Sequence, residues 1–247
     1  MKIPTQKMII LRIATIFALV ECIIMLGFAN LTFEIGAYAE VFLDVVILVT
    51  LSTPLIYIWV IKPYVVARDD AMDQVTHMAC HDSLTQLANR HLLKEFLEKV
   101  ISQFVREQSY GAVIYIDLDG FKAINDNYGH DAGDATLVSV AKRLSAIVRN
   151  EDIVSRVGGD EFVVVLSQLG CDAQLANKRA LILAERVLDE LNKDIYFNDA
   201  TLKIGASIGL RLLAPETIST DYVLKDADTA MYLAKHAGKG NIVVHGE

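Results

Sequence analysis

Two long apolar runs stand at the start of the chain. Residues 8–31 and 41–61 are almost uninterrupted apolar stretches, and each has about the 20 residues that a helix needs to cross the hydrocarbon core of a membrane. Arg12 and Asp44 lie near the ends of these runs, where charged groups reach the membrane surface. Glu21 lies deeper and needs a partner or a proton. The pattern predicts two transmembrane helices, because the first run is too long for a cleaved signal peptide and no small-residue cleavage site follows it.

Basic residues flank the two runs, whereas the segment between them is acidic. Lys2 and Lys7 precede the first run, and Lys62 and Arg68 follow the second. Residues 32–40 carry two glutamates and neither Lys nor Arg. Because basic residues favour the cytoplasmic side, we expect both termini and the rest of the chain to lie in the cytoplasm.

A linker segment follows the second run. Pro63 is predicted to end or kink the helix there. Apolar residues then recur at steps of seven, three and four, at Val65, Met72, Val75 and Ala79. Two heptads fit either a single amphipathic helix or a parallel helical dimer. The chain is thus expected to consist of a membrane anchor over residues 1–62, a linker helix over 63–79 and a globular domain over 80–247.

The pattern changes to alternating helices and strands from residue 80. Helical spacing covers 92–105, 121–127, 132–148, 174–191, and a last helix that opens with Thr220 or Asp221 as its cap and ends at Gly238. Strand patterns cover 111–119, 153–157, 162–166, 202–213 and 241–245. Turn residues 158–161 join two of these strands into a hairpin. The order predicts an α/β (α+β) fold with a mixed, largely antiparallel central sheet and helices packed on it.

Composition narrows the choice of partners. The chain has 23 Lys and Arg against 31 Asp and Glu, a formal net charge of −8, which argues against nucleic-acid binding because that needs a basic surface. Cys22, Cys80 and Cys171 lie far apart and have neither metal-ligand spacing nor an even disulfide framework. We expect all three to be small buried hydrophobic residues in a reducing compartment.

Carboxylates stand at the end of a predicted strand and in the predicted hairpin turn. Asp117 and Asp119 share one face of their strand because they are two residues apart. Asp160 and Glu161 follow two glycines in the turn. If the strand lies beside the hairpin, Asp117 and Asp160 converge, and such a cluster is unfavourable unless a cation lies between the acids. Mg²⁺ bound by one or two carboxylates and by substrate phosphates fits this need. The alternative is a solvated hairpin turn.

Residues that suit a nucleotide follow the first pair of acids. Gly120 and Phe121 open a helix whose free amide groups attract phosphate oxygens, and Lys122 adds a positive charge. Asn125 and Asp134 provide an amide and a carboxylate, a pair able to hydrogen-bond the edge of guanine.

Two further pairs have two interpretations each. Lys235 and Lys239 lie four residues apart at the end of the last helix, where they serve either the helix dipole or a bound phosphate. Arg149 and Asp152 form an R-x-x-D pattern, which in isolation is usually a surface ion pair. Neither pair identifies a ligand without further context.

Four ordered motifs give the sequence a recognisable resemblance. They are DSLTQLANR (82–90), DLDGFKAINDNYGHDAGD (117–134), RVGGDEF (156–162) and AMYLAKHAGKGN (230–241). Over about residues 78–244 the chain resembles the GGDEF family of diguanylate cyclases. The resemblance implies a nucleotidyl-cyclase (palm-like) fold and synthesis of cyclic di-3′,5′-guanylate from two GTP with loss of two pyrophosphates. It also implies a signalling enzyme, of the kind that controls biofilms, in the inner membrane of a bacterium.

The resemblance assigns roles to the acids. Asp117 and Asp160 would hold Mg²⁺, or Mn²⁺ in its place, with the carbonyl of Leu118 as a further ligand. Asp160 also stands where the family has its proton acceptor, and Glu161 would complete the acidic site.

Roles for the substrate-binding residues follow in the same way. The backbone of Gly120 and Phe121 would hold phosphates, and Lys122 would stabilise the transition state. The remaining contacts to GTP would come from Asn125, His130 and Asp134 on the nucleoside, and from Lys235 and Lys239 on the triphosphate. Relatives often have Arg where this chain has Lys239; lysine keeps the charge but loses bidentate geometry.

The resemblance also implies dimerisation and feedback. Each domain would bind one GTP, so that two domains must meet, and Arg149 and Asp152 would form a product-inhibitory site for cyclic di-GMP. One alternative is a catalytically silent, membrane-anchored receptor or scaffold for cyclic di-GMP. Another is an enzyme that makes mixed purine dinucleotides, which Asp134 disfavours because its carboxylate suits guanine. No phosphodiesterase domain is expected after Val244.

Overall fold

The computed structural model describes residues 5–30, 36–217 and 219–246. Lys2 and Glu34, on which the predicted orientation partly depends, lie outside the described residues. The chain divides into two compact units, Met1–His77 and Met78–Glu247. Each unit is described by itself.

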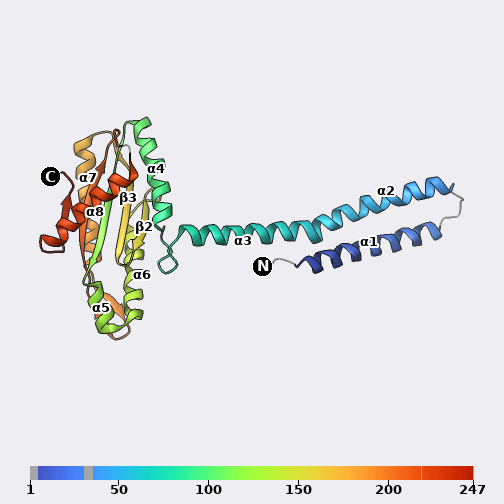
Figure 1. The fold of residues 1–247 in the computed structure, drawn as a ribbon, viewed down its shortest axis with the longest axis horizontal. Helices are drawn as coiled ribbons and strands as arrows, with labels where there is room; N and C mark the ends of the chain where they lie inside the picture. The colour runs from blue at the N-terminus through green and yellow to red at the C-terminus, as the bar shows by residue number, and fades with distance from the viewer. Residues whose placement is uncertain (1–4, 31–35, 218, 247) are drawn as a thin grey trace. The chain divides into compact units, whose positions relative to one another are not determined.

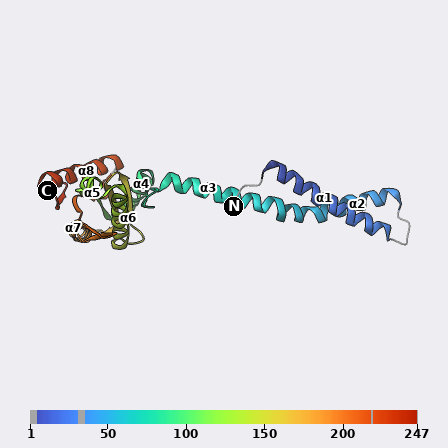
Figure 2. The same cartoon turned by 90° about the horizontal axis from the view of Figure 1, so that it is seen from below.

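The first unit is a pair of long apolar helices. Helix α1 (Gln6–Ala29) packs beside α2 (Ala37–Ile56), as Figures 1 and 2 show. The chain continues through a π-helical turn, η1 (Tyr57–Ile61), into α3 (Lys62–Cys80). Both apolar stretches are long enough to cross a membrane, and only 17% and 6% of the residues in their most apolar windows are buried. These helices therefore differ from the core helix of a soluble domain, which buries most of its apolar side chains.

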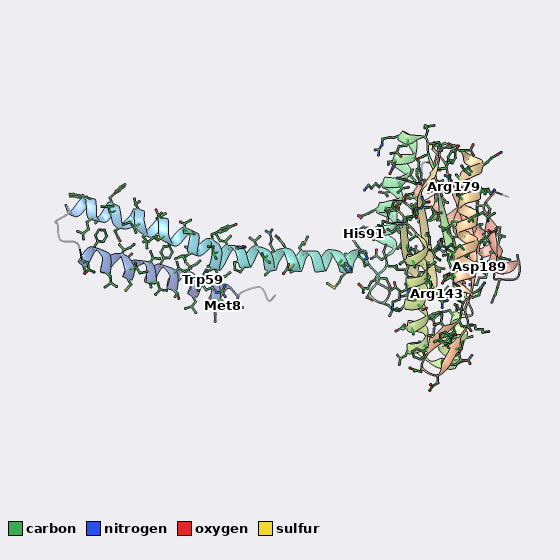
Figure 3. The ribbon with its side chains drawn as sticks, turned by 180° about the vertical axis from the view of Figure 1, so that it is seen from behind. Met8, Trp59, His91, Arg143, Arg179 and Asp189 are labelled. Atoms are coloured by element: carbon green, nitrogen blue, oxygen red, sulfur yellow. The ribbon has the colours of Figure 1, made fainter. Side chains whose placement is uncertain are left out.

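The helix continues through Pro63, so the predicted end there is wrong; the other alternative, a local distortion, corresponds to the π-turn just before it. In an α-helix, the carbonyl group of Trp59 would accept from the amide of residue 63, and proline has no N–H. The guanidinium of Arg12 in α1 fills this gap, because its Nη1 donates to the Trp59 carbonyl oxygen at 3.0 Å. In the preceding π-turn, the amide of Lys62 donates to the carbonyl of Tyr57, five residues back. Trp59 is labelled in Figure 3. A side chain of one helix thus satisfies a backbone group that proline leaves open in its neighbour.

The linker residues form the helix α3. Val65, Met72 and Ala79 are exposed on it. The side chain of Val75, the fourth residue of the apolar stripe, lies outside the described residues. A single amphipathic helix and a parallel helical dimer therefore both remain as predictions for this segment.

A five-stranded sheet forms the centre of the second unit. Its order is β2-β3-β1-β6-β7, with β1 (Tyr110–Asp119), β2 (Ile153–Gly158), β3 (Glu161–Gly170), β6 (Gly205–Leu213) and β7 (Ile242–Val244). Neighbouring strands are antiparallel except β6 and β7, which are parallel. The predicted mixed and largely antiparallel sheet is confirmed.

Helices cover both faces of this sheet. One face packs against α5 (Phe121–Tyr128), α6 (His130–Ile147) and α7 (Ala173–Leu191). The other face packs against α4 (Arg90–Glu107) and α8 (Thr220–His236); Figure 2 shows α7 and α8 on opposite sides. Successive side chains of β1 point to opposite faces of the sheet. Because helices cover both faces, nearly all of these side chains are buried, and the sequence of the strand is an almost continuous apolar run.

Arg143, labelled in Figure 3, joins two of the helices. It lies on α6, and its guanidinium donates to the carbonyls of Glu190, Lys193 and Asp194 at 3.0, 2.7 and 2.7 Å. These carbonyls lie at and just after the end of α7, where a helix leaves its last carbonyl groups without intrahelical donors.

The strand predicted over residues 202–213 is wrong at its start. Leu202 belongs to a separate hairpin, formed by β4 (Ile195–Phe197) and β5 (Ala200–Leu202), and β6 begins only at Gly205. Leu202 and Ile204 are both buried, so the apolar alternation runs across the break. The local sign of this hairpin is the turn at Asn198, which has a positive φ of 50°.

The last helix begins and ends slightly differently from the prediction. Ser219 occupies the N-cap position instead of Thr220 or Asp221, and the helix ends at His236. Asp221 lies in the first turn and forms an ion pair with Lys94 at 2.8 Å. A serine one position earlier is an equally good cap by residue type, so propensity alone does not fix the boundary.

The cysteines were expected to be buried, which is wrong for two of them. Cys22 and Cys171 are exposed and Cys80 is half-buried. Cys22 lies on α1, a helix with few buried residues, and Cys171 lies at the bend between β3 and α7. Apolar residue type therefore did not decide their burial.

Candidate active site

The end of β1 lies directly beside the hairpin turn. Strands β1 and β3 are antiparallel neighbours, with Asp117 opposite Glu161. The backbone amide of Leu118 donates to the carbonyl of Asp160 at 3.2 Å. This adjacency is the condition under which Asp117 and Asp160 were predicted to converge.

Asp117 is a buried carboxylate paired with a lysine. Its Oδ1 lies 2.7 Å from Nζ of Lys235, on α8. Burial raises the pKa of Asp117, and the nearby Asp160 and Asp119 add to the rise, although Lys235 opposes it. The hydrogen bond to Asp117 in turn raises the pKa of Lys235. The acids therefore form an electrostatically coupled cluster instead of an independently solvated turn.

Asp119 holds the loop that follows α8. Oγ of Ser207 lies 3.0 Å from both carboxylate oxygens, and the amide of Gly240 donates to Oδ2 at 3.1 Å. Gly238, Lys239 and Gly240 all have positive φ values of 125°, 63° and 58°, a conformation that favours glycine. Asp119 thus stabilises the turn that carries Lys239, a role the sequence did not reveal.

Glu161 has a partner on the neighbouring strand. The hydroxyl of Tyr115 donates to its Oε2 at 3.0 Å. Burial raises the pKa of Tyr115, and the negative charge of Glu161 raises it further. Tyr115 lies in an apolar run, which does not mark it as a site residue. The signal in the sequence is its position two residues before Asp117, on the same face of the strand.

Arg156 connects the turn to the first motif of the domain. Its Nε and Nη2 donate to the carbonyl of Gly159 at 3.0 and 2.7 Å, and its Nη1 donates to Oδ1 of Asp82 at 3.0 Å. The same Asp82 oxygen accepts from the amide and hydroxyl of Thr85 at 2.8 and 2.7 Å. Burial alone would raise the pKa of Asp82, but the hydrogen bonds from Thr85 and Arg156 lower it.

The residues expected to bind the nucleoside lie on α5 and α6, which contact each other. Asn125 is half-buried, whereas His130 and Asp134 are exposed. A side chain at Gly133 would collide with the amide group of Asn125, so glycine permits this close approach. Gly120 precedes α5 with a φ of 84°, and Lys122 is exposed in the first turn.

The donors at the acid cluster fit a magnesium ion completed by substrate. Among residues 5–30, 36–217 and 219–246, no group of three or more His, Cys, Asp or Glu side chains is arranged to hold a metal. Mg²⁺ commonly takes only one or two carboxylates and completes its shell with phosphates and water. Asp117 and Asp160, with the Leu118 carbonyl, offer such a set, and the mutual repulsion of the acids favours a cation there.

A cavity of about 290 Å³, lined by none of the acids at the hairpin turn, contains the R-x-x-D residues. Arg149, Asp152, Arg179 and Arg186 all line it. Arg179, on α7 and labelled in Figure 3, donates to the carbonyl of Leu169 at 2.8 Å. The two α7 arginines were not singled out from the sequence, because nothing local relates them to residue 149.

The fold and the acid cluster define a nucleotidyl-cyclase-like domain, and comparisons with known proteins name its family. The family model described as "Diguanylate cyclase, GGDEF domain" matches residues 79–241. The chain belongs to this family.

Similar proteins occur among curated sequences. The bifunctional diguanylate cyclase/cyclic di-GMP phosphodiesterase MucR of Pseudomonas aeruginosa is 39% identical over 166 residues, which are 67% of this chain and 23% of MucR. Diguanylate cyclase TpbB of the same species is 36% identical over 173 residues, 70% of this chain and 39% of TpbB. The chain thus matches well under half of the length of these two relatives.

Solved structures agree with the fold. The isolated GGDEF domain of TpbB (YfiN) superposes with a TM-score of 0.62 at 36% identity, covering 67% of this chain and 94% of that one. The GGDEF domain of DgcB from Caulobacter crescentus, solved with cyclic di-GMP, gives 0.61 at 25% identity and covers 68% and 94%.

Proposed function

We propose that this protein is a diguanylate cyclase, which joins two GTP molecules into cyclic di-3′,5′-guanylate and releases two pyrophosphates. The observation that carries the proposal is the acid cluster at β1 and the hairpin turn. It keeps Asp117, Asp160 and Glu161 together with the cation of Lys235, inside the region that matches the family. TpbB is a diguanylate cyclase and MucR a bifunctional diguanylate cyclase/cyclic di-GMP phosphodiesterase, and their similarity to this chain supports the same reaction.

Different side chains of the protein have different roles in this reaction. Asp160 accepts the proton of the attacking 3′-hydroxyl, as the family resemblance suggests. Lys122, Lys235 and Lys239 offset the negative charge of the triphosphate. Asp117, Asp160 and the Leu118 carbonyl hold Mg²⁺, or Mn²⁺ in its place, which when bound supplies positive charge to the phosphate oxygens.

GTP is the proposed substrate because the chain has side chains that suit the hydrogen-bonding edge of guanine. Asn125 and Asp134 bind the guanine edge and His130 contacts the nucleoside, while the amides of Gly120 and Phe121 bind phosphates. The left-handed backbone at Gly120 and the close contact of Gly133 with Asn125 support this arrangement. A carboxylate at position 134 suits the N–H groups of guanine and disfavours a mixed dinucleotide with adenine.

The reaction requires two domains, so we include a homodimer in the proposal. One domain presents the 3′-hydroxyl of its GTP to the α-phosphate held by another. Val65 and Met72, seven residues apart and exposed on α3, support pairing through this helix. The proposed division of the chain is an anchor over 1–62, this linker over 63–79 and the cyclase domain over 80–247.

We also propose that α1 and α2 anchor the protein in the bacterial inner membrane. Their length, apolar character and exposure support this, and the flanking basic residues favour cytoplasmic termini.

A product-inhibitory site is proposed at the cavity that contains Arg149 and Asp152. Arginine side chains suit the phosphates of cyclic di-GMP because they donate paired, charge-assisted hydrogen bonds. Arg149, Arg179 and Arg186 line the cavity together with Asp152. The same cavity favours one alternative function, a receptor that binds cyclic di-GMP without making it.

Product analysis separates the two functions. Purified full-length protein is incubated with GTP and Mg²⁺, and cyclic di-GMP and pyrophosphate are measured. We expect product from wild type, and Asp160→Asn to lower turnover by at least about a hundredfold, because it removes a metal ligand and the proposed base. Asp199→Asn, at the exposed β4–β5 turn, is the matched control. A wild-type protein that binds cyclic di-GMP but releases no pyrophosphate would support the receptor instead.

A further inference from the structure

Tyr115 and Glu161 form a hydrogen-bonded pair beside the acid cluster. The tyrosine hydroxyl donates to Oε2 of the glutamate at 3.0 Å, from the neighbouring strand. We propose that Glu161 adds its carboxylate to the cation site of Asp117 and Asp160, and that Tyr115 is a positioning residue whose hydroxyl fixes this carboxylate. The inference rests on the proposed function, because it concerns the same site.

The register of the sheet explains why Glu161 needs a partner. Asp117 and Glu161 lie directly opposite each other on β1 and β3, and side chains opposite each other share a face of the sheet. Like charges in that arrangement repel. Each acid has its own donor, since Lys235 binds Asp117 at 2.7 Å while Tyr115 binds Glu161. The two carboxylates are thereby held by separate groups.

The packing of Tyr115 separates the role of its hydroxyl from that of its ring. The residue is only 6% exposed, and its ring belongs to the apolar cluster between the sheet and helices α4 and α8. A phenylalanine would supply the same apolar contacts. A buried tyrosine hydroxyl needs a hydrogen-bond partner, and this hydroxyl has the Glu161 carboxylate.

The geometry leaves the second carboxylate oxygen available. The Tyr115 hydroxyl contacts Oε2, and within the described parts of the chain Oε1 of Glu161 accepts no hydrogen bond. That oxygen lies on the residue next to Asp160, at the same turn. A hydrogen bond to one oxygen of a metal-binding carboxylate orients the other, and loss of such a partner typically weakens metal binding about 10- to 100-fold.

The test compares Tyr115→Phe with Tyr110→Phe in the full-length protein. Tyr110 is a half-buried tyrosine at the start of the same strand, so the control makes the same chemical change away from the acids. Mn²⁺ binding is measured by electron paramagnetic resonance with a non-hydrolysable GTP analogue present. We expect Y115F to bind Mn²⁺ about tenfold more weakly or worse, and its half-maximal activity to need correspondingly more metal. KM for GTP at saturating metal should stay unchanged, and Y110F should match wild type.

A double-mutant cycle with Glu161→Gln distinguishes positioning from a general loss of structure. If Tyr115 acts through Glu161, Y115F causes no further loss of Mn²⁺ affinity in the E161Q background. Wild-type Mn²⁺ affinity in Y115F, or an equal loss in both backgrounds, overturns the inference. A wild-type protein that makes no product from GTP overturns the proposed function instead, and leaves the Mn²⁺ comparison decisive for Tyr115.

Discussion

Arg149 and Asp152 differ in how the surrounding structure holds them. Asp152 accepts hydrogen bonds from the amides of Ser167 and Arg149 at 3.0 and 3.2 Å, so its carboxylate stabilises the start of β2 against β3. Arg149 is exposed, and its guanidinium lies 3.8 Å from Glu151, a contact that contributes little to stability. Of the two residues, Arg149 is the one that can be removed without disturbing the fold.

We therefore predict that Arg149→Ala weakens product feedback and leaves catalysis intact. Loss of a charge-assisted hydrogen bond to phosphate, about 1.5–3 kcal/mol, lowers affinity for cyclic di-GMP roughly ten- to a hundredfold. Initial rates at low product should be unchanged. Titration of cyclic di-GMP with rate and binding followed together tests this, with Arg106→Ala, an exposed arginine on α4, as control. Inhibition at the same product concentration as wild type would show that R-x-x-D is here only a surface pair.

Some site residues could be predicted from the sequence and others could not, and the difference has a physical reason. Asp117 and Asp160 were predictable because acids at the end of an apolar strand and in a glycine turn are locally unusual. The contacts of Tyr115 and Asp119 were not, since they depend on the register of β1 with β3 and β6. Register is set by packing of the whole sheet.

At the scale of elements, the hairpin turn is fastened to the segment before α4. Arg156 bonds both the Gly159 carbonyl and Asp82, so the turn between β2 and β3 does not move independently of residues 82–85. The motif at residues 82–90 and the glycine turn are therefore one structural unit, although 74 residues separate Asp82 from Arg156.

We predict that Asp82→Asn destabilises the cyclase unit in a pH-dependent way. Its pKa is lower in the fold than the ordinary 3.8, so its stabilisation is present above that pH and is lost as pH falls through the folded pKa. Loss of about 1.5–3 kcal/mol at pH 7 lowers Tm by roughly 3–12 °C. Thermal melts from pH 7 to 3 should show the difference from wild type shrinking below 3.8. Asp189→Asn, exposed on α7, serves as control; a pH-independent difference would contradict the prediction.

Element boundaries were less predictable than the elements themselves. The apolar periodicity gave α4, β1, α7 and the hairpin within a few residues. It joined β5 to β6, because Leu202 and Ile204 continue the alternation across the break. Between Leu202 and Gly205 the chain leaves the two-stranded β4-β5 sheet and enters the five-stranded sheet. This change of sheet depends on tertiary packing, and the local sequence pattern does not contain it.

At the scale of the whole molecule, the proposed topology has a direct test. Gly36→Cys should be labelled by a membrane-impermeant thiol reagent in intact cells, because the segment between the helices is proposed to face outward. Gly36 has open space around its Cα, so cysteine fits. Exposed Cys171 should be labelled only after lysis, which makes it an internal control once Cys22 and Cys80 are replaced. The reverse pattern would overturn the topology.

The π-turn between α2 and α3 has a consequence for the face that α3 presents. A π-turn contains about one residue more than an α-turn, and one residue corresponds to about 100° of rotation about a helix axis. The azimuth of a residue is its angular position around the helix axis. Residues after Ile61 therefore lie about 100° around the axis from the azimuth that an unbroken α-helix from Ala37 would give them. The azimuth of Val65 and Met72 is consequently determined by the turn at Tyr57–Ile61, next to the carbonyl that Arg12 binds. Conversion of this turn to α-helical geometry would rotate that stripe by more than a quarter of a circle without any change in its sequence.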